Sequence, residues 1–270
     1  MNHAGSRGQD IRQWLAAYRI AGCDIERARE VEEAYTGHYN DAYLAGDMSF
    51  LDNEDIQCVW DDDARYPFRF EEKGVQRPRL LFCYGELALF NRPSVCICGA
   101  REASSDGLEA ANACARELVR ASYAVVSGYA RGVDLSAHIG AMEADGDTIA
   151  LLPYGFSRFG IRKDLHDFYN PAHFLAATEL PPTYPFIRDA ALRRNTLMAT
   201  LAEAVIVVEP GETGGTWYTA VRAAEMNRPL FFCEGGRPEI IPRMEKLGAA
   251  RIPFRHGVPC IDELVMRCGR

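Results

Sequence analysis

From Pro78 onward, apolar segments of strand length alternate with segments of helical pattern in a regular succession. The apolar segments are residues 80–85, 95–99, 123–128, 147–155, 174–178, 204–210 and 228–235. The helical patterns lie at residues 104–121, 134–146, 188–203 and 215–227. Strands that are apolar along most of their length are typical of a parallel sheet covered on both faces by its connecting helices. The sequence therefore predicts an α/β fold with a mostly parallel sheet and helices on both faces.

The beginning of the chain has a different character, polar and helical rather than apolar and alternating. Four apolar side chains there are spaced to share one face of a short helix, namely Trp14, Leu15, Tyr18 and Ile20. We therefore expect three parts: an acidic, mainly helical N-terminal region at residues 1–64, the α/β domain at 65–237, and a short C-terminal tail at 238–270.

The net charge of −8 is concentrated in the first part of the chain. Residues 1–78 hold 9 Lys and Arg against 16 Asp and Glu, whereas residues 79–270 hold 21 against 22. This balance argues against a protein that coats duplex DNA through bulk positive charge. The second part contains only two lysines, Lys163 and Lys246, and its other basic residues are arginines. Arginine offers a planar fork that matches phosphate oxygens, so a local phosphate pocket is compatible with the composition.

No segment reaches the roughly 18 apolar residues that a membrane span needs, and the first residues contain no apolar signal core. We therefore expect a cytoplasmic protein without membrane contact. The nine cysteines form no CxxC pair, and four of them lie in apolar strand segments, namely Cys83, Cys96, Cys98 and Cys233. These four are expected to be buried reduced thiols rather than metal ligands or disulfides.

Four clusters of glycine, arginine and hydroxyl residues stand out as candidates for a binding site. They are Gly99–Arg101, Ser127–Asp134 followed by His138, Arg193–Asn195, and Glu209–Thr216 followed by Thr219. In parallel sheets, ligands bind beyond the carboxyl ends of the strands, where the strand order reverses. Glycines before a helix let the backbone approach an anion, which the first helical N–H groups then hold. Each glycine turn alone is also consistent with a tight turn, but together they favour a phosphate site.

No motif in the sequence requires catalysis, a cofactor or a metal. GxGxxG does not follow the first buried strands, GxxxxGK[ST] is absent, and no Ser-His-Asp or Cys-His spacing is recognisable. Asp134 is equally well explained as a helix cap, and a single helical histidine such as His138 is more often packed than catalytic. Glu179, Glu203 and Glu209 are expected to pair with arginines rather than to act in acid–base chemistry.

Seven motifs occur in a fixed order between about residues 65 and 235. They are ARYPFRFEEKGVQRPRLLFCYGELALF, VCICGAR, VVSGYARGVDLSAH, DTIALLPYG, ATELPP, RRNTLMATLAEAVIVVE and TGGTWYTAVRAAEMNRPLFF. This ordered set resembles the DprA/Smf family of DNA-processing proteins, a branch of the Rossmann-like SLOG superfamily, and VVSGYARGVDLSAH is its most specific part. The resemblance implies an extended Rossmann-like fold, binding of single-stranded DNA in a positively charged pocket, assistance in loading a RecA-type recombinase, and a homodimer.

The resemblance also implies which positions contact DNA and its phosphates. They are Gly99, Arg101, Ser127, Gly128, Arg131, Gly132, Asp134, His138, Arg194, Asn195, Gly214, Gly215, Thr216 and Thr219. Thr196 departs from the family pattern, because a second basic residue usually stands there, and the adjacent Arg193 is a candidate replacement. Tyr129, Trp217 and Tyr218 lie beside the glycine turns and could either stack on bases or pack beneath the loops.

Two other functions remain open at this level. The segment Thr213–Thr216 is similar to a phosphate-binding turn of the nucleotide phosphoribohydrolases and nucleotide sensors that share the superfamily. An acidic member of that superfamily could therefore bind or hydrolyse a small nucleotide. The third hypothesis is an adaptor whose acidic N-terminal region contacts a basic protein.

Overall fold

The computed structural model of the chain describes residues 11–22, 24–34, 42–72, 74–233 and 238–269. Its centre is one nine-stranded sheet with the order β1-β2-β6-β5-β4-β3-β7-β8-β9. The strands are β1 Gln57–Trp60, β2 Leu80–Gly85, β3 Ser94–Gly99, β4 Ala124–Ser127, β5 Thr148–Leu151, β6 Phe174–Thr178, β7 Ala204–Val208, β8 Leu230–Cys233 and β9 Ala250–Ile252. All pairs from β6 to β9 are parallel, whereas β2 runs antiparallel to both β6 and β1. The predicted mostly parallel α/β sheet is confirmed.

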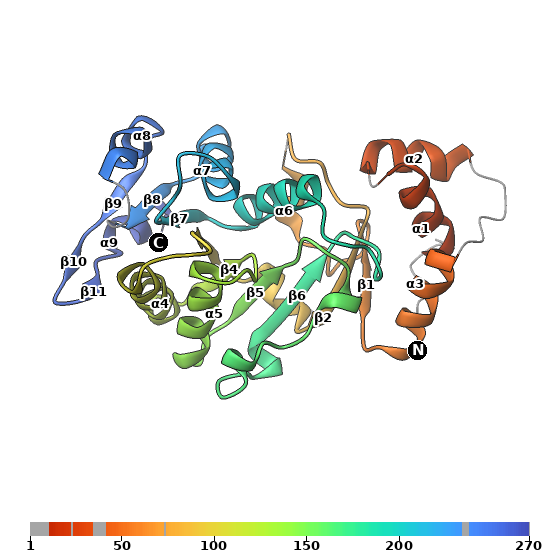
Figure 1. The fold of residues 1–270 in the computed structure, drawn as a ribbon, viewed down its shortest axis with the longest axis horizontal. Coiled ribbons are helices and arrows are strands. Elements are labelled where there is room, and N and C mark those ends of the chain that lie inside the picture. The colour runs from red at the N-terminus through yellow and green to blue at the C-terminus, as the bar shows by residue number, and fades with distance from the viewer. Residues whose placement is uncertain (1–10, 23, 35–41, 73, 234–237, 270) are drawn as a thin grey trace.

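Helices cover both faces of the sheet (Figure 1). On one face lie α4 Ser105–Arg120 and α5 Val133–Glu143, and on the other lie α6 Arg188–Leu201 and α7 Gly215–Glu225. Strand β3 lies between β4 and β7. After β3 the chain adds β4, β5 and β6 on one side of it, and then β7, β8 and β9 on the other. Right-handed crossovers place helices on opposite faces when that direction reverses. The order therefore reverses at β3, and the carboxyl ends of β3, β4 and β7 meet at this point.

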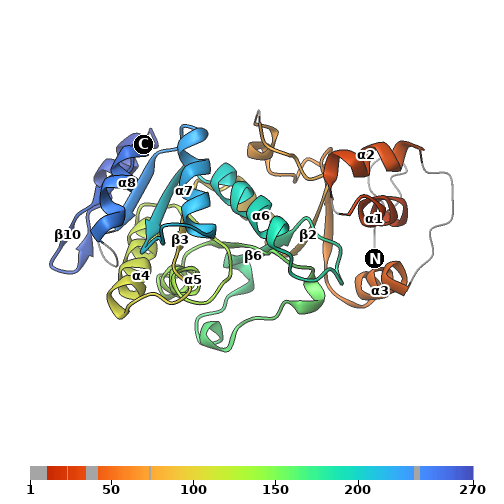
Figure 2. The same cartoon turned by 45° about the horizontal axis from the view of Figure 1, so that its top comes forward.

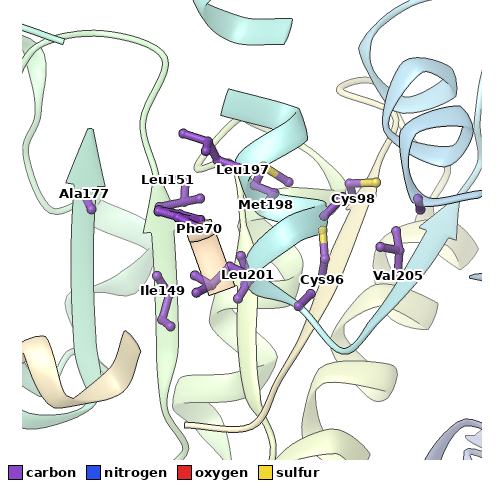
Figure 3. Close-up of a cluster of buried hydrophobic side chains, with 14 of the residues drawn as sticks. Phe70, Cys96, Cys98, Ile149, Leu151, Ala177, Leu197, Met198, Leu201 and Val205 are labelled. Carbon is purple, nitrogen blue, oxygen red and sulfur yellow. The ribbon is translucent and has the colours of Figure 1, made fainter. Parts of the chain in front are cut away.

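Alternate side chains of the central strands enter different cores, as the two-residue period of a strand requires. Val95 and Ile97 pack toward α4 and α5, while Cys96 and Cys98 pack toward α6 and α7. Figure 3 shows the second of these cores, in which Met198 from α6 lies beside the two cysteines. The predicted burial of thiols is confirmed for Cys83, Cys96, Cys98 and Cys233, and the described cysteines are free.

Three N-terminal helices pack at the β1 end of the sheet, opposite the end that carries α8 and β10 (Figures 1 and 2). They are α1 Ile11–Ile20, α2 Ile25–Ala34 and α3 Ala42–Asn53. Trp14, Leu15 and Tyr18 are buried as the helical spacing predicts, but Ile20 is exposed because it ends the helix. These helices share one core with β1, β2 and β6, so they are built onto the sheet rather than tethered to it.

The sheet extends beyond both boundaries predicted for the α/β domain. Strand β1 precedes residue 65 and pairs with β2, and β9 follows residue 237 and pairs with β8. After β9 come a small hairpin, β10 Phe254–Arg255 with β11 Val258–Pro259, and α9 Asp262–Arg267; α8 Ile241–Lys246 precedes β9. β1 and β9 are edge strands of four and three residues, too short to carry a clear periodic signal. Among the described helices, none combines the length and the hydropathy that a bilayer crossing requires.

Candidate functional site

Two pockets open at the edge where the carboxyl ends of the central strands meet. The first, of about 350 Å³, is lined by the turn after β4 and by the connection between β5 and β6. The second, of about 400 Å³, is lined by the first turns of α6 and α7 and by the glycine turn before α7. Arg101, Phe186 and Arg194 line both pockets, so the two share a wall. We call the two pockets together the arginine cleft.

Five arginines line the cleft, and no carboxylate is found among its described lining residues. They are Arg101, Arg131, Arg162, Arg188 and Arg194. Arg131 pairs with Glu102, and both of those side chains are exposed. Arg194 lies near the buried carboxylate of Asp134, and the other three form no ion pair with any residue that the structure describes. This edge is therefore strongly cationic, although the chain as a whole is acidic. Guanidinium groups without carboxylate partners are suited to binding phosphate.

Arg194 is the most deeply buried of these arginines, with 6% of its surface exposed. Its Nη1 donates to the carbonyl of Leu151 at 3.3 Å, and its Nε has no hydrogen-bond partner among the described residues. The carboxylate of Asp134 lies close to this guanidinium, because both border the position that a β-carbon at Gly128 would occupy. Burial lowers the pKa of Arg194 and raises that of Asp134, while the attraction between the two opposes both shifts. Arg194 is thus a desolvated cation at the base of the cleft.

Glycine at position 128 makes this placement of Arg194 possible. A β-carbon at Gly128 would lie 1.5 Å from Nη1 of Arg194 and 2.6 Å from Oδ2 of Asp134. The guanidinium therefore occupies the space that any other residue would fill. The glycine of the second cluster therefore has a steric explanation: a larger residue at position 128 would displace the side chain of Arg194.

Two of the helices that start near the cleft, α5 and α7, are preceded by a glycine with positive φ. Gly132 precedes α5 with φ +82°, and Gly214 precedes α7 with φ +100°. Glycine has no side chain that could accept from the first N–H groups, and neither helix has a side-chain cap within the described part of the chain. Gly214 and Gly215 line the second pocket, so the start of α7 faces it. Exposed N–H groups at the positive end of a helix favour an anion.

The structure brings only part of the predicted set to the cleft surface. Arg101, Gly128, Arg131, Arg194, Asn195, Gly214 and Gly215 line the pockets. Gly99, Ser127, Gly132, Asp134, His138, Thr216 and Thr219 lie beneath them and do not appear in either lining.

The residues beneath the cleft hold its strands and helices together. Ser127 Oγ donates to the carbonyl of Ile97 at 2.6 Å, and Thr216 Oγ1 donates to the carbonyl of Gly99 at 2.9 Å. The amide of Asn195 and the hydroxyl of Thr219 both donate to the carbonyl of Gly215, at 3.0 and 2.9 Å. The bond from Ser127 joins β4 to β3, whereas the bonds from Thr216 and Asn195 fix the start of α7 against β3 and α6.

His138 and Asp134 also have structural partners. His138 is fully buried, and its Nδ1 lies 2.7 Å from Oγ1 of Thr148. Burial, with smaller contributions from Arg162 and Arg194, lowers the pKa of His138 to about 3, so the ring is neutral and adds no positive charge to the cleft. Asp134 accepts a hydrogen bond from the backbone of Ala130 at 3.4 Å, within the turn that precedes α5.

The aromatic residues beside the glycine turns divide into two kinds. Tyr129 packs beneath the loop, with its ring against His138, Phe159 and Phe174 and only 3% of its surface exposed. Trp217 and Tyr218 line the second pocket and are partly exposed, although Trp217 also carries the guanidinium of Arg243 over its ring at 4.2 Å. Of these three, Tyr129 is therefore unavailable for stacking on a ligand.

Arg193 does not fill the place of the missing basic residue at Thr196. Its Nε donates to Oε1 of Glu179 at 2.8 Å, away from the cleft, and it lines neither pocket. The predicted pairing of acidic residues with arginines is confirmed for Glu179 and for Glu203, which pairs with Arg69 at 2.8 Å.

The same prediction is wrong for Glu209. Its carboxylate accepts hydrogen bonds from the backbone and hydroxyl of Ser104, where α4 begins. The positive end of the α4 dipole stabilises the Glu209 carboxylate at this place, so the carboxylate does not need an arginine partner. Ser104 in turn caps α4, because its hydroxyl oxygen accepts a hydrogen bond from the backbone N–H of Gly107 at 3.1 Å.

Sequence reasoning missed several residues of the cleft, among them Tyr154, Arg162, Phe186 and Arg188. Arg162 donates from Nη2 to the carbonyl of Tyr129 at 3.2 Å and has no carboxylate partner within the described chain. Phe186 is 49% exposed although it is a large apolar side chain. Arg162 lies in the connection between β5 and β6, and Phe186 lies in the connection between β6 and α6. No periodic pattern marks a functional side chain in such connections.

Comparisons with known proteins match this region of the chain. The profile of the family described as DNA recombination-mediator protein A matches residues 57–248. The chain is 30% identical over 183 residues to DNA processing protein DprA of Bacillus subtilis, which covers 67% of this chain and 61% of that protein. It is 31% identical over 175 residues to DprA of Streptococcus pneumoniae, which covers 64% and 61%. The chain thus spans about three fifths of the length of these curated relatives.

Solved structures agree with the sequence matches. The X-ray structure of DprA from Streptococcus pneumoniae has a TM-score of 0.68 at 25% identity, covering 90% of this chain and 84% of that one. DNA processing protein A from Helicobacter pylori, whose structure concerns its single-stranded DNA binding mode, has a TM-score of 0.65 at 24% identity, covering 79% and 95%. The second likeness speaks to the fold alone.

Proposed function

Because the chain belongs to the DNA recombination-mediator protein A family, we propose that it is a DNA-processing protein that binds single-stranded DNA in the arginine cleft. The observation that carries the proposal is the gathering of five arginines around two adjoining pockets of an acidic chain. The Helicobacter pylori protein shares this fold and its structure concerns single-stranded DNA binding, so single-stranded DNA is the first ligand to test.

The chemistry of the cleft suits a strand with exposed phosphates and bases. Arg101 and Arg194 on the shared wall would bind phosphate, and the first N–H groups of α7 would bind a neighbouring one. Phe186, exposed on the same wall, offers a face on which a base would stack. Phosphate contacts and stacking carry little base information, so we expect weak sequence preference.

The arginines are expected to dominate the affinity and its dependence on salt. Arg101→Ala and Arg162→Ala should each weaken binding of labelled oligo-dT and lower the slope of log K against log salt by about 0.7, the contribution of one phosphate contact on a single strand. Fluorescence anisotropy across a salt series measures both quantities.

Arg116→Ala is the matched control for these two variants. Arg116 is an exposed arginine of α4 whose Nη1 lies 3.9 Å from Oε2 of Glu143, and it lines neither pocket. It should leave both affinity and slope unchanged. Equal losses for all three variants would mean that binding follows overall charge and not the cleft.

We further propose that the chain assists loading of a RecA-type recombinase and forms a homodimer. Both proposals rest on family membership. Recombinase loading predicts faster filament formation on strands that carry a single-strand binding protein, and Arg101→Ala should remove the effect. Sedimentation equilibrium tests the dimer, and a monomer at micromolar concentration would contradict it.

A small nucleotide is the competing ligand, because pockets of about 350 and 400 Å³ fall within the range that small ligands occupy. A ligand that binds only the folded chain raises its melting temperature. Stabilisation by purine mononucleotides and not by oligonucleotides would favour a sensor or a phosphoribohydrolase and overturn the DNA proposal.

A further inference from the structure

A fully buried carboxylate joins the N-terminal helices to the segment that carries Phe186. Asp47 of α3 accepts hydrogen bonds through Oδ2 from Nε and Nη2 of Arg19 in α1, at 2.8 and 2.6 Å. Through Oδ1 it accepts from the backbone N–H and the hydroxyl of Thr183, at 2.7 and 2.8 Å. Arg19 also donates to the Thr183 hydroxyl at 2.8 Å. Both carboxylate oxygens of Asp47 and the hydroxyl of Thr183 therefore have hydrogen-bond partners.

Thr183 lies in the connection between β6 and α6, three residues before Phe186. The same connection is held from its other side, where the N–H groups of Gly155 and Ser157 donate to the carbonyls of Tyr184 and Pro182, both at 2.9 Å. It is thus clamped between the β5–β6 connection and the N-terminal helices. Phe186 follows the clamp and forms part of the wall that both pockets share.

We propose that Asp47 and Thr183 are positioning residues, which fix the 180–186 segment and thereby set Phe186 against the ligand. The proposal rests on the proposed function of the cleft. A buried hydrogen-bonded network specifies one geometry, because any other position of the segment would leave Oδ1 of the fully buried Asp47 without the two partners that Thr183 supplies. The N-terminal helices, which contribute no lining residue to either pocket, would then act on DNA binding through this contact.

Thr183→Val is the mildest test, since valine keeps the size of threonine and leaves the Arg19–Asp47 pair and the backbone bond in place. Oligo-dT affinity is compared for the wild type, Thr183→Val, Phe186→Ala and the double variant. We expect Thr183→Val to weaken binding about fivefold and Phe186→Ala about tenfold. In the double variant, Thr183→Val should add nothing, because the group that it positions is gone. Full multiplication of the two losses, or wild-type affinity for Thr183→Val, would overturn the inference.

Hydrogen exchange without DNA supplies a second readout that does not depend on the ligand. Thr183→Val should speed amide exchange in residues 180–187 several-fold. Unchanged exchange there would also overturn the inference. If exchange rises but the wild type does not bind oligo-dT even at low salt, the proposed function fails while the contact between Asp47 and the segment stands.

Asp61→Asn is the control. Asp61 pairs with Arg29 at 2.7 Å and with Arg79 at 3.2 Å, so it also joins the N-terminal helices to the sheet, but at β1 and β2. It should leave both oligo-dT affinity and exchange of residues 180–187 at wild-type values. A comparable change in Asp61→Asn would mean that any loosening of the N-terminal helices suffices, and would refute a specific role for Asp47 and Thr183.

Discussion

Replacing Gly128 with alanine is expected to weaken oligo-dT binding about a hundredfold while lowering the free energy of unfolding by only about 1 kcal/mol. The new methyl group would fall 1.5 Å from Nη1 of Arg194, so the guanidinium must leave its place. The guanidinium is the far end of a long, flexible side chain, so it can move away from the new methyl group without a shift of the backbone. The free energy of unfolding therefore falls only a little. The binding geometry is lost because the main buried cation no longer faces the phosphate.

Gly160→Ala provides the comparison for this variant. Gly160 lies in the β5–β6 connection close to Arg162, its φ is not positive, and a β-carbon there meets nothing within 4 Å. Its affinity and stability should match those of the wild type. Anisotropy and urea unfolding measure the two quantities, and wild-type affinity in Gly128→Ala would show that DNA does not use Arg194 where it now lies.

Arg194→Met is expected to have the largest effect on stability, about 3 kcal/mol at pH 7, besides its effect on binding. Methionine fills much of the volume of arginine but leaves the buried carboxylate of Asp134 without its main positive neighbour. Burial raises the pKa of Asp134 in the folded chain. A group whose pKa is raised on folding favours the folded state at low pH and loses that contribution as pH rises through the folded pKa.

Removal of Arg194 raises the pKa of Asp134 further, so the difference in stability between wild type and variant should shrink as the pH falls and the carboxyl takes up a proton in both proteins. A protonated carboxyl no longer needs the guanidinium. Chemical unfolding between pH 8 and pH 5 measures the trend. Asp134→Asn serves as the background that removes the titration, and a pH trend that persisted in it would assign the effect to another group.

The sequence predicts the strands and glycine turns around the site better than it predicts which side chains line the cleft. Continuous apolar strands and glycine turns are strong local signals, and the α/β order that they predict is confirmed. Adjacent residues on a helix point about 100° apart, yet the sequence alone does not state which direction faces the cleft. Arg193 and Arg194 illustrate this: one meets Glu179 and the other meets Gly128.

The parts that sequence reasoning missed depend on contacts between distant segments. Arg162 is placed by its bonds to Tyr129, and Phe186 follows a segment held by Asp47 from the far end of the chain. Hydroxyl residues are similarly ambiguous, because Thr219 turns back to the carbonyl of Gly215 instead of facing the pocket. Such choices follow from packing and not from local pattern.

The reversal of strand order at β3 has a consequence for how the protein becomes competent to bind. Arg101 and Arg131 follow strands on one side of the reversal, whereas Gly214 and Gly215 come from the other side, and Arg194 crosses between them. Neither half of the chain contains a whole site. The two parts of the site come together only when β4 and β7 have both paired with β3, and β7 is far from β3 in the sequence. A chain still emerging from synthesis therefore carries its arginines without a cleft, and the affinity for DNA that we propose would arise only with the completed fold.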